Sequence, residues 1–253
     1  MTQAPVPTPL HLGPPKRPVF AVLHATAQPP RAQLLLCPPI LNEHARSYRL
    51  FSVLARHLAA QGIAVLRFDY YGTGDSGGDD DAFTLGSACD DAMLASAHLA
   101  DVAGSVPAFV MGVRAGGLVA IETASRTRAS GGLVLWQPIA DWTDYLRETG
   151  ALDARQRAAI PAGHAISKDT LMGFALSKDF HAHTAGMATW PGDGHVGRTI
   201  VIDDDAAPVG VGATAIPAPP SLTRWTGQAE MGTFPNTQIR DVAAALAGAM
   251  GVA

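Results

Sequence analysis

The sequence has few of the features that mark secreted, membrane-spanning or nucleic-acid-binding proteins. It contains only two cysteines, Cys37 and Cys89, too few for a disulfide framework in 253 residues. It has no apolar run of about eighteen residues and no cationic, apolar N-terminal leader, so we predict neither a membrane span nor a secretory signal. The net charge of −4 and the lack of a basic stripe argue against a nucleic-acid partner. These absences predict a cytoplasmic protein with free thiols.

The composition that is present predicts one folded domain with a loose N-terminal tail. The chain is 47% hydrophobic and 16% charged, and a chain of this length can bury one substantial core. Residues 1–16 are rich in proline, which disfavours both helix and sheet, so we predict an irregular tail followed by a single domain over 17–253. The prolines of the tail are Pro5, Pro7, Pro9, Pro14 and Pro15.

Short apolar runs alternate with helical patterns along the chain. This alternation predicts an α/β fold with a mostly parallel, doubly wound sheet. Residues 140–190 contain amphipathic pieces, such as 142–148 and 169–176, and we predict a small helical cap there. The predicted strands are 17–24 at an edge, 33–37, 63–69, 108–111, 132–137, 199–202 and a last one at 221–225. The predicted helices are 47–61, 85–102, 118–125 and 239–250.

Three loops at strand ends resemble those of α/β-hydrolases. Gly112-Val113-Arg114-Ala115-Gly116 resembles the G-x-S-x-G nucleophile elbow, in which a sharp turn lifts one side chain above the sheet. The segment from Asp69 to Ser76 resembles the D-x-x-G-x-G-x-S loop, and 37–43 stands where the family has its oxyanion loop. The resemblance covers 17–140 and implies a single-domain α/β-hydrolase fold. Within it, the Pro38-Pro39 loop, the following glutamate and the elbow arginine resemble the exosortase-A-associated hydrolases.

Two components of the hydrolase triad are missing. Arg114 stands at the position that the resemblance assigns to the serine nucleophile, and a guanidinium offers only hydrogen-bond donors. The resemblance places the general base near 227–236, where no histidine occurs, and the sequence has none after His195. The acid position is filled by Asp203, Asp204 or Asp205. Ordinary serine esterase activity is therefore not expected.

Arg114 has two readings. It could bind a carboxylate or phosphate together with the backbone amides at the helix N-terminus beside Ala115. Alternatively, it fills the pocket in which the family's serine would act, through a salt bridge to Glu43 or Asp203. Glu43 either faces this pocket or is a solvated loop residue, and we predict that His44 is at the surface. The predicted ligand-binding residues are Arg114, Ala115, Cys37, Pro38 and Ile40.

Other chemistry-bearing residues have simpler explanations. Cys37 as a substitute nucleophile is disfavoured, because apolar surroundings raise the pKa of a thiol. Ser76 is expected to form turn hydrogen bonds, and Asp79–Asp81 to be solvated. His181 and His183, with Asp193 and His195 nearby, lack a firm further ligand, so we predict no metal and no cofactor.

The sequence leaves three functions open. The leading one is a non-canonical α/β-hydrolase-fold protein that binds a small acyl or anionic ligand near Arg114. The second is a non-serine enzyme of a biosynthetic pathway (a lyase, a cyclase or an acyl-transfer helper) with Glu43 or His44 as base, Arg114 as clamp and Asp203 retained. The third is a scaffold with a closed pocket. The sequence also leaves open whether the chain binds a second copy of itself or another protein of the pathway.

Overall fold

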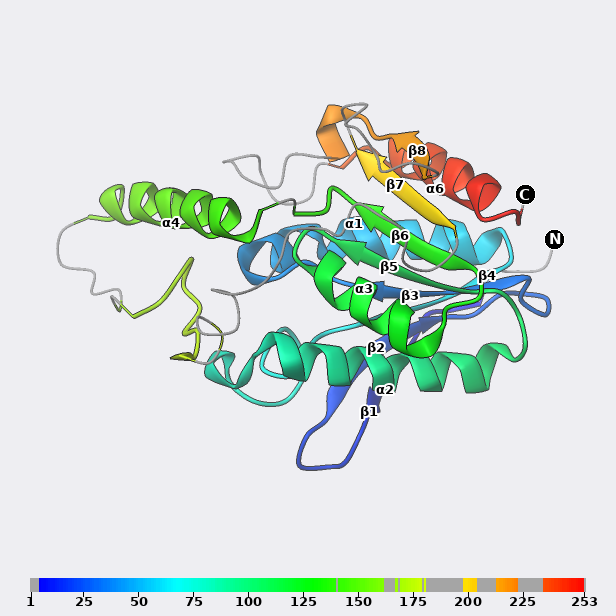
Figure 1. Ribbon diagram of the computed structural model, residues 1–253, viewed down its shortest axis with the longest axis horizontal. Coiled ribbons are helices and arrows are strands. Elements are labelled where there is room, and N and C mark those ends of the chain that lie inside the picture. The colour runs from blue at the N-terminus through cyan, green and yellow to red at the C-terminus, as the bar shows by residue number, and fades with distance from the viewer. Residues whose placement is uncertain are drawn as a thin grey trace.

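One mixed, mostly parallel sheet organises the structure. The computed structural model describes residues 5–139, 141–161, 167, 169–178, 180, 198–203, 213–222 and 234–252. Eight strands run in the order β1-β2-β4-β3-β5-β6-β7-β8 (Figure 1). The pairs β1–β2 and β2–β4 are antiparallel, and all the other pairs are parallel. The strands are β1 (Thr8–Leu12), β2 (Val19–His24), β3 (Ala32–Cys37), β4 (Ile63–Phe68), β5 (Ala108–Val113), β6 (Gly132–Trp136), β7 (Thr199–Asp203) and β8 (Thr214–Pro217).

Helices cover both faces of the sheet, as predicted. Successive β3 residues face opposite cores: Leu35 packs with α2 (Leu85–Ala103) and α3 (Gly116–Thr127), whereas Leu34 packs with α1 (Leu41–Ala60) and α6 (Asn236–Ala249). Every residue of β3 and of β4 is buried, which explains their continuous apolar runs. The predicted α/β-hydrolase fold is confirmed, and its parallel strands all end at the edge of the sheet that carries the elbow.

The proline-rich segment was predicted wrongly as irregular throughout. Thr8–Leu12 forms β1, which pairs with β2, so the strand predicted at 17–24 is not an edge strand. Pro9 lies opposite Val22 in this edge pairing. A proline lacks the N–H that an inner strand needs, but an edge strand has one side without a neighbour.

The end of the sheet was also predicted only in part. β7 pairs in parallel with β6, as predicted for 199–202, and its last residue is Asp203. Where a strand was predicted at 221–225, residues 221 and 222 belong instead to a short 3-10 helix, Pro220–Leu222, and residues 223–225 lie outside the described part. The last described strand is β8, whose Ile216 pairs with Ile202 and is buried.

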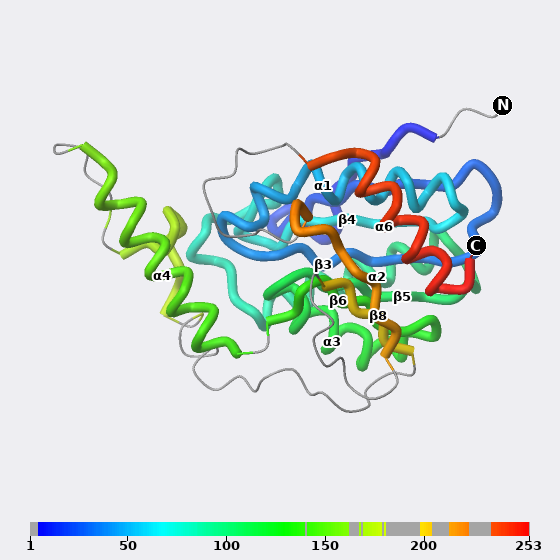
Figure 2. Tube along the Cα trace, turned by 90° about the horizontal axis from the view of Figure 1, so that it is seen from above, coloured from blue at the N-terminus to red at the C-terminus, as the bar shows by residue number. Residues whose placement is uncertain are grey.

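Part of the predicted cap is helical. Helix α4 (Trp142–Ala158) projects from the body of the protein (Figure 2), on the side toward which the arrows of the parallel strands point (Figure 1). The piece at 169–176 is no helix but holds a tight turn, in which Leu171 and Phe174 exchange backbone hydrogen bonds of 2.9 and 3.0 Å. Arg157 of α4 joins the two segments by donating to the Ser167 and Thr170 carbonyl oxygens at 2.8 and 2.7 Å. None of the described helices is both long and apolar enough to cross a bilayer.

A buried histidine between β2 and β4 makes the stability depend on pH. Arg67 Nε donates to His24 Nε2 at 3.2 Å, and both residues are buried. Burial first, and then the charges of Arg67 and Arg56, lower the pKa of His24 from 6.5 to about 4. The unfolded chain therefore binds more protons between these two values, so the folded state loses stability as pH falls.

We expect the free energy of unfolding to fall by about 2 kcal/mol more in the wild type than in His24→Gln between about pH 7 and pH 5. Glutamine can accept the Arg67 hydrogen bond but does not titrate in this range. Urea unfolding of both proteins measures the difference, and parallel pH profiles would contradict the prediction.

Candidate functional site

The turn between β5 and α3 has the geometry of a nucleophile elbow. Arg114 has a φ of 50°, in the left-handed region that non-glycine residues rarely adopt. Its N–H donates to the Trp136 carbonyl oxygen at 3.0 Å, and its own carbonyl oxygen accepts from Gly117 N at 3.0 Å. A Cβ on Gly116 would lie 2.5 Å from the Cys37 carbonyl oxygen, so the loop after β3 packs directly on the start of α3. Arg114 thus sits at the sharp turn that the sequence predicted.

The Arg114 side chain is paired with a carboxylate. Its Nε donates to Glu43 Oε1 at 3.3 Å, and Nη1 donates to the Gln137 carbonyl oxygen at 3.5 Å. The guanidinium carbon lies 5.7 Å from the centre of the Tyr145 ring. Glu43 and Asp203 were the two predicted salt-bridge partners of a pocket-filling Arg114, and Glu43 is the one in contact. Asp203 instead accepts from Gln137 Nε2 at 3.2 Å.

Glu43 is a buried residue of the first turn of α1. The helix begins at Leu41, six residues before the predicted start, so Glu43 and His44 are helical and the solvated-loop reading is wrong. The predicted start was late because the apolar repeat begins only at Leu50. Only 2% of Glu43 is exposed, and Glu43 Oε2 accepts from the Tyr145 hydroxyl at 3.4 Å.

The charge of Glu43 depends on its neighbours. Burial raises the pKa of Glu43, while the Arg114 charge and the hydrogen bonds from Arg114 and Tyr145 oppose that rise. The pKa of Tyr145 is raised well above its usual value by burial and then by the Glu43 charge. Tyr145 therefore stays a neutral donor, and Arg114 favours the ionised form of Glu43.

A second pair lies at the end of the neighbouring strand. His44 Nε2 and Asp69 Oδ1 are 3.0 Å apart, and the two side chains are 12% and 4% exposed. The surface position predicted for His44 is thus wrong. Sequence reasoning did not single out Asp69, although it is the first residue of the D-x-x-G-x-G-x-S motif. No sequence signal linked it to His44, because the contact joins two separate elements.

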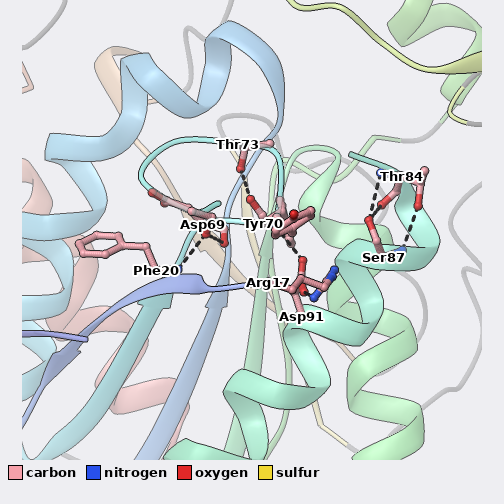
Figure 3. A network of polar contacts seen from close by, with 10 residues as sticks. Arg17, Phe20, Asp69, Tyr70, Thr73, Thr84, Ser87 and Asp91 are labelled. Carbon is pink, nitrogen blue, oxygen red and sulfur yellow. Dashed lines mark hydrogen bonds and ion pairs between the residues drawn. The ribbon is translucent and has the colours of Figure 1, made fainter. Parts of the chain in front are cut away.

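The glycine-rich loop holds Asp69 in place. Asp75 N donates to Asp69 Oδ2 at 2.9 Å, and the Ser76 hydroxyl donates to the Asp69 carbonyl oxygen at 2.6 Å. Ser76 Oγ also accepts from Phe20 N at 2.8 Å, which ties the loop to β2 (Figure 3). Ser76 therefore forms turn hydrogen bonds, as predicted.

Asp91 of α2 anchors the same loop from below. Its Oδ2 accepts from Tyr71 N at 2.8 Å, and its Oδ1 forms an ion pair with Arg17 (Figure 3). The Arg17 guanidinium carbon also lies 4.6 Å from the centre of the Tyr71 ring. The α2 helix that carries Asp91 begins with a capping box between Thr84 and Ser87. The strand end that carries Asp69 is thus fixed from two sides.

The remaining predicted ligand-binding residues surround the elbow but are enclosed. Cys37, Pro38, Ile40 and Ala115 are all buried, so their roles toward a ligand stay predictions. Burial raises the pKa of the Cys37 thiol well above its usual value, which agrees with the argument against a cysteine nucleophile. Tyr70 covers this loop by donating its hydroxyl to the Pro38 carbonyl oxygen at 3.1 Å.

Several predicted candidates cannot be placed. His181, His183, Asp193, His195, Asp204, Asp205 and most of 227–236 lie outside the described residues. Within the part that is described, no group of three or more histidine, cysteine, aspartate or glutamate side chains is placed to hold a metal ion.

The family model described as "Serine aminopeptidase, S33" matches residues 28–178, more than half of the chain. The chain belongs to this family. The match includes Glu43, His44, Asp69 and Arg114, and therefore both side-chain pairs. No curated protein matches the sequence closely enough to count as a relative.

Solved structures show that this S33-family chain shares its fold with esterases. Est1E from Butyrivibrio proteoclasticus, solved with ferulic acid bound, is 16% identical with a TM-score of 0.60, and the match covers 96% of this chain and 99% of that one. An esterase from Pyrococcus furiosus is 18% identical with a TM-score of 0.60, covering 97% and 92%. A lidless serine hydrolase from Xanthomonas campestris is 16% identical with a TM-score of 0.55, covering 96% and 93%. At these identities the likeness establishes the fold alone.

Proposed function

We propose that this S33-family protein is non-hydrolytic and binds a small acyl or anionic ligand at Arg114, which replaces the nucleophile serine of the family. The observation that carries the proposal is the way Arg114 is held. Arg114 Nε donates to the Glu43 carboxylate and Nη1 donates to the Gln137 carbonyl oxygen. Arg114 Nη2 has no hydrogen-bond partner among the residues that the structure describes. With 19% of its side chain exposed, Arg114 can present Nη donors to a carboxylate or phosphate.

The same arrangement disfavours covalent catalysis at the elbow. A guanidinium cannot attack a carbonyl, and the Glu43 contact holds it in the turn where a serine would have to stand. An acyl ligand could place its carbonyl or carboxylate oxygen beside Arg114 without forming a covalent intermediate. The Pro38-Pro39 loop, Glu43 and the elbow arginine also support a place beside the exosortase-A-associated hydrolases, and hence a biosynthetic setting.

Two matched variants test anion binding. Glu43→Gln keeps Arg114 and an acceptor for its Nε, whereas Arg114→Ala/Glu43→Gln differs from it only in the loss of the arginine. We expect the double variant to bind butyrate, phosphate or ferulate more weakly by about 1.5–3 kcal/mol, roughly ten- to more than a hundredfold in Kd. Ferulate is included because Est1E binds ferulic acid. Isothermal titration calorimetry measures the affinities.

Reactivity provides the complementary measurement. The wild type should neither cleave p-nitrophenyl acetate above a buffer control nor be labelled by a fluorophosphonate probe. Stoichiometric labelling of any serine would contradict the proposal. If none of the three anions binds to the wild type or to Glu43→Gln, the scaffold reading with a closed pocket replaces it.

A further inference from the structure

His44 and Asp69 have the geometry of an oriented acid–base pair. Both oxygens of the Asp69 carboxylate are engaged: Oδ2 accepts from Asp75 N at 2.9 Å, and Oδ1 faces His44 Nε2 at 3.0 Å. An ionised carboxylate can only accept hydrogen bonds, so His44 must carry its proton on Nε2. This tautomer leaves the lone pair of His44 on Nδ1. Within the described part of the chain, Nδ1 has no hydrogen-bond partner.

The first turn of α1 connects this pair to the Arg114 site. Glu43 and His44 are consecutive residues of that turn, and Glu43 contacts Arg114 while His44 contacts Asp69. Asp69 follows β4 and Arg114 follows β5, and β3 lies between these two strands. Two interstrand spacings amount to about 10 Å, which is the separation of the two strand ends.

We propose that His44 is a general base toward the ligand held by Arg114, and that Asp69 is its positioning residue. The proton of an O–H or an acidic C–H of the ligand moves to Nδ1, and Asp69 stabilises the imidazolium that forms. The same proton later returns to the ligand or passes to water, so no further reactant is needed. The ligand class is a small carboxylate that carries such a proton a few ångströms from its carboxylate. This inference rests on the proposed anion site.

The tautomer is tested directly by ¹H–¹⁵N NMR of histidine-labelled protein, with His44→Gln to assign the signals. We expect neutral His44 to carry its proton on Nε2 in the wild type. In Asp69→Asn, the amide oxygen can still accept from Asp75 N, and the amide N–H₂ then faces His44. The proton should therefore move to Nδ1. A wild-type His44 protonated on Nδ1 would overturn the inference.

Proximity to the ligand is tested by carbethoxylation, in which an unprotonated imidazole nitrogen attacks a carbonyl carbon of diethyl pyrocarbonate. At ten times its Kd, butyrate should slow modification of His44 by about tenfold in the wild type and in Glu43→Gln, by mass action. The protection should vanish in Arg114→Ala/Glu43→Gln at the same butyrate concentration. His57 is the internal control, because thirteen residues of helix place it about 20 Å away along α1. Its rate should not change.

The outcomes separate the two proposals. If butyrate binds in an Arg114-dependent way but does not protect His44, the base assignment is wrong and the proposed function stands. If butyrate does not bind, the proposed function fails and the base assignment fails with it. Neither decision depends on Asp69→Asn, so poor folding of that variant would not block them.

Discussion

Replacing Arg114 by alanine is expected to lower the free energy of unfolding by about 3 kcal/mol, because it leaves the Glu43 carboxylate buried without its cation. Only 2% of Glu43 is exposed, and after the substitution its remaining side-chain donor among the described residues is the Tyr145 hydroxyl at 3.4 Å. The estimate is at the lower end for a broken buried pair because the Arg114 side chain is 19% exposed. Urea unfolding of the wild type and the variant at neutral pH measures the loss.

The pH dependence of this loss identifies Glu43 as its source. Arg114 lowers the pKa of Glu43, which burial otherwise raises, so its removal raises that folded-state pKa further. The folded variant then binds more protons than the unfolded chain, and its stability increases as pH falls. The gap between Arg114→Ala and the wild type should therefore narrow toward acidic pH.

A double variant provides the control. Arg114→Ala/Glu43→Gln removes the buried charge as well, so it should regain much of the stability that Arg114→Ala lost. An unchanged unfolding free energy in Arg114→Ala would mean that the ion pair contributes nothing. The site would then be an open pocket with a free arginine.

The sequence predicted the parts of the fold that depend on local pattern. Apolar runs such as 33–37 and 132–137 became β3 and β6 because strands buried on both faces need apolar side chains on both sides. Its failures have tertiary causes. Thr8–Leu12 is a strand because β2 offers a partner, which proline content alone cannot reveal. Residues 221 and 222, the start of the strand predicted at 221–225, belong instead to the 3-10 helix Pro220–Leu222.

The candidate site was predicted to a similar degree. Arg114 was placed at the elbow because the small residues around it form a local motif. Glu43 was one of the two salt-bridge partners predicted for it. The contact between His44 and Asp69 was not found, because it joins the start of α1 to the end of β4 and no spacing rule links them. Side-chain pairing between separate elements depends on how the helix packs, which the sequence pattern leaves open.

Close packing at the elbow explains why glycines stand on both sides of Arg114. The arginine side chain projects from the turn, but the strand and helix on either side must still approach each other closely. A Cβ on Gly112 would lie 2.5 Å from the Gly117 Cα and 2.6 Å from the Ala120 Cβ. The steric requirement of the turn is therefore independent of catalysis.

Gly116→Ala is accordingly expected to destabilise the protein by about 3 kcal/mol or more, because overpacking against rigid backbone cannot be relieved by side-chain rotation. The added Cβ would lie 2.5 Å from the Cys37 carbonyl oxygen and 2.9 Å from the Pro38 carbonyl carbon. The matched control is Gly117→Ala, where the nearest atom is the Leu135 Cδ2 at 3.5 Å, an ordinary contact. Alanine there should be neutral, or stabilising by up to about 1 kcal/mol, because it favours the helix.

Thermal and urea unfolding of the two alanine variants test whether the loop after β3 packs against the start of α3. Equal stability of the two variants would contradict that packing. If Gly116→Ala still folds, it should also bind butyrate more weakly than Gly117→Ala. The displaced loop, which contains Pro38 and Ile40, leads directly into α1, and Glu43 lies in the first turn of that helix. A shift of that turn would change how Glu43 holds Arg114, even though neither charged residue has been altered.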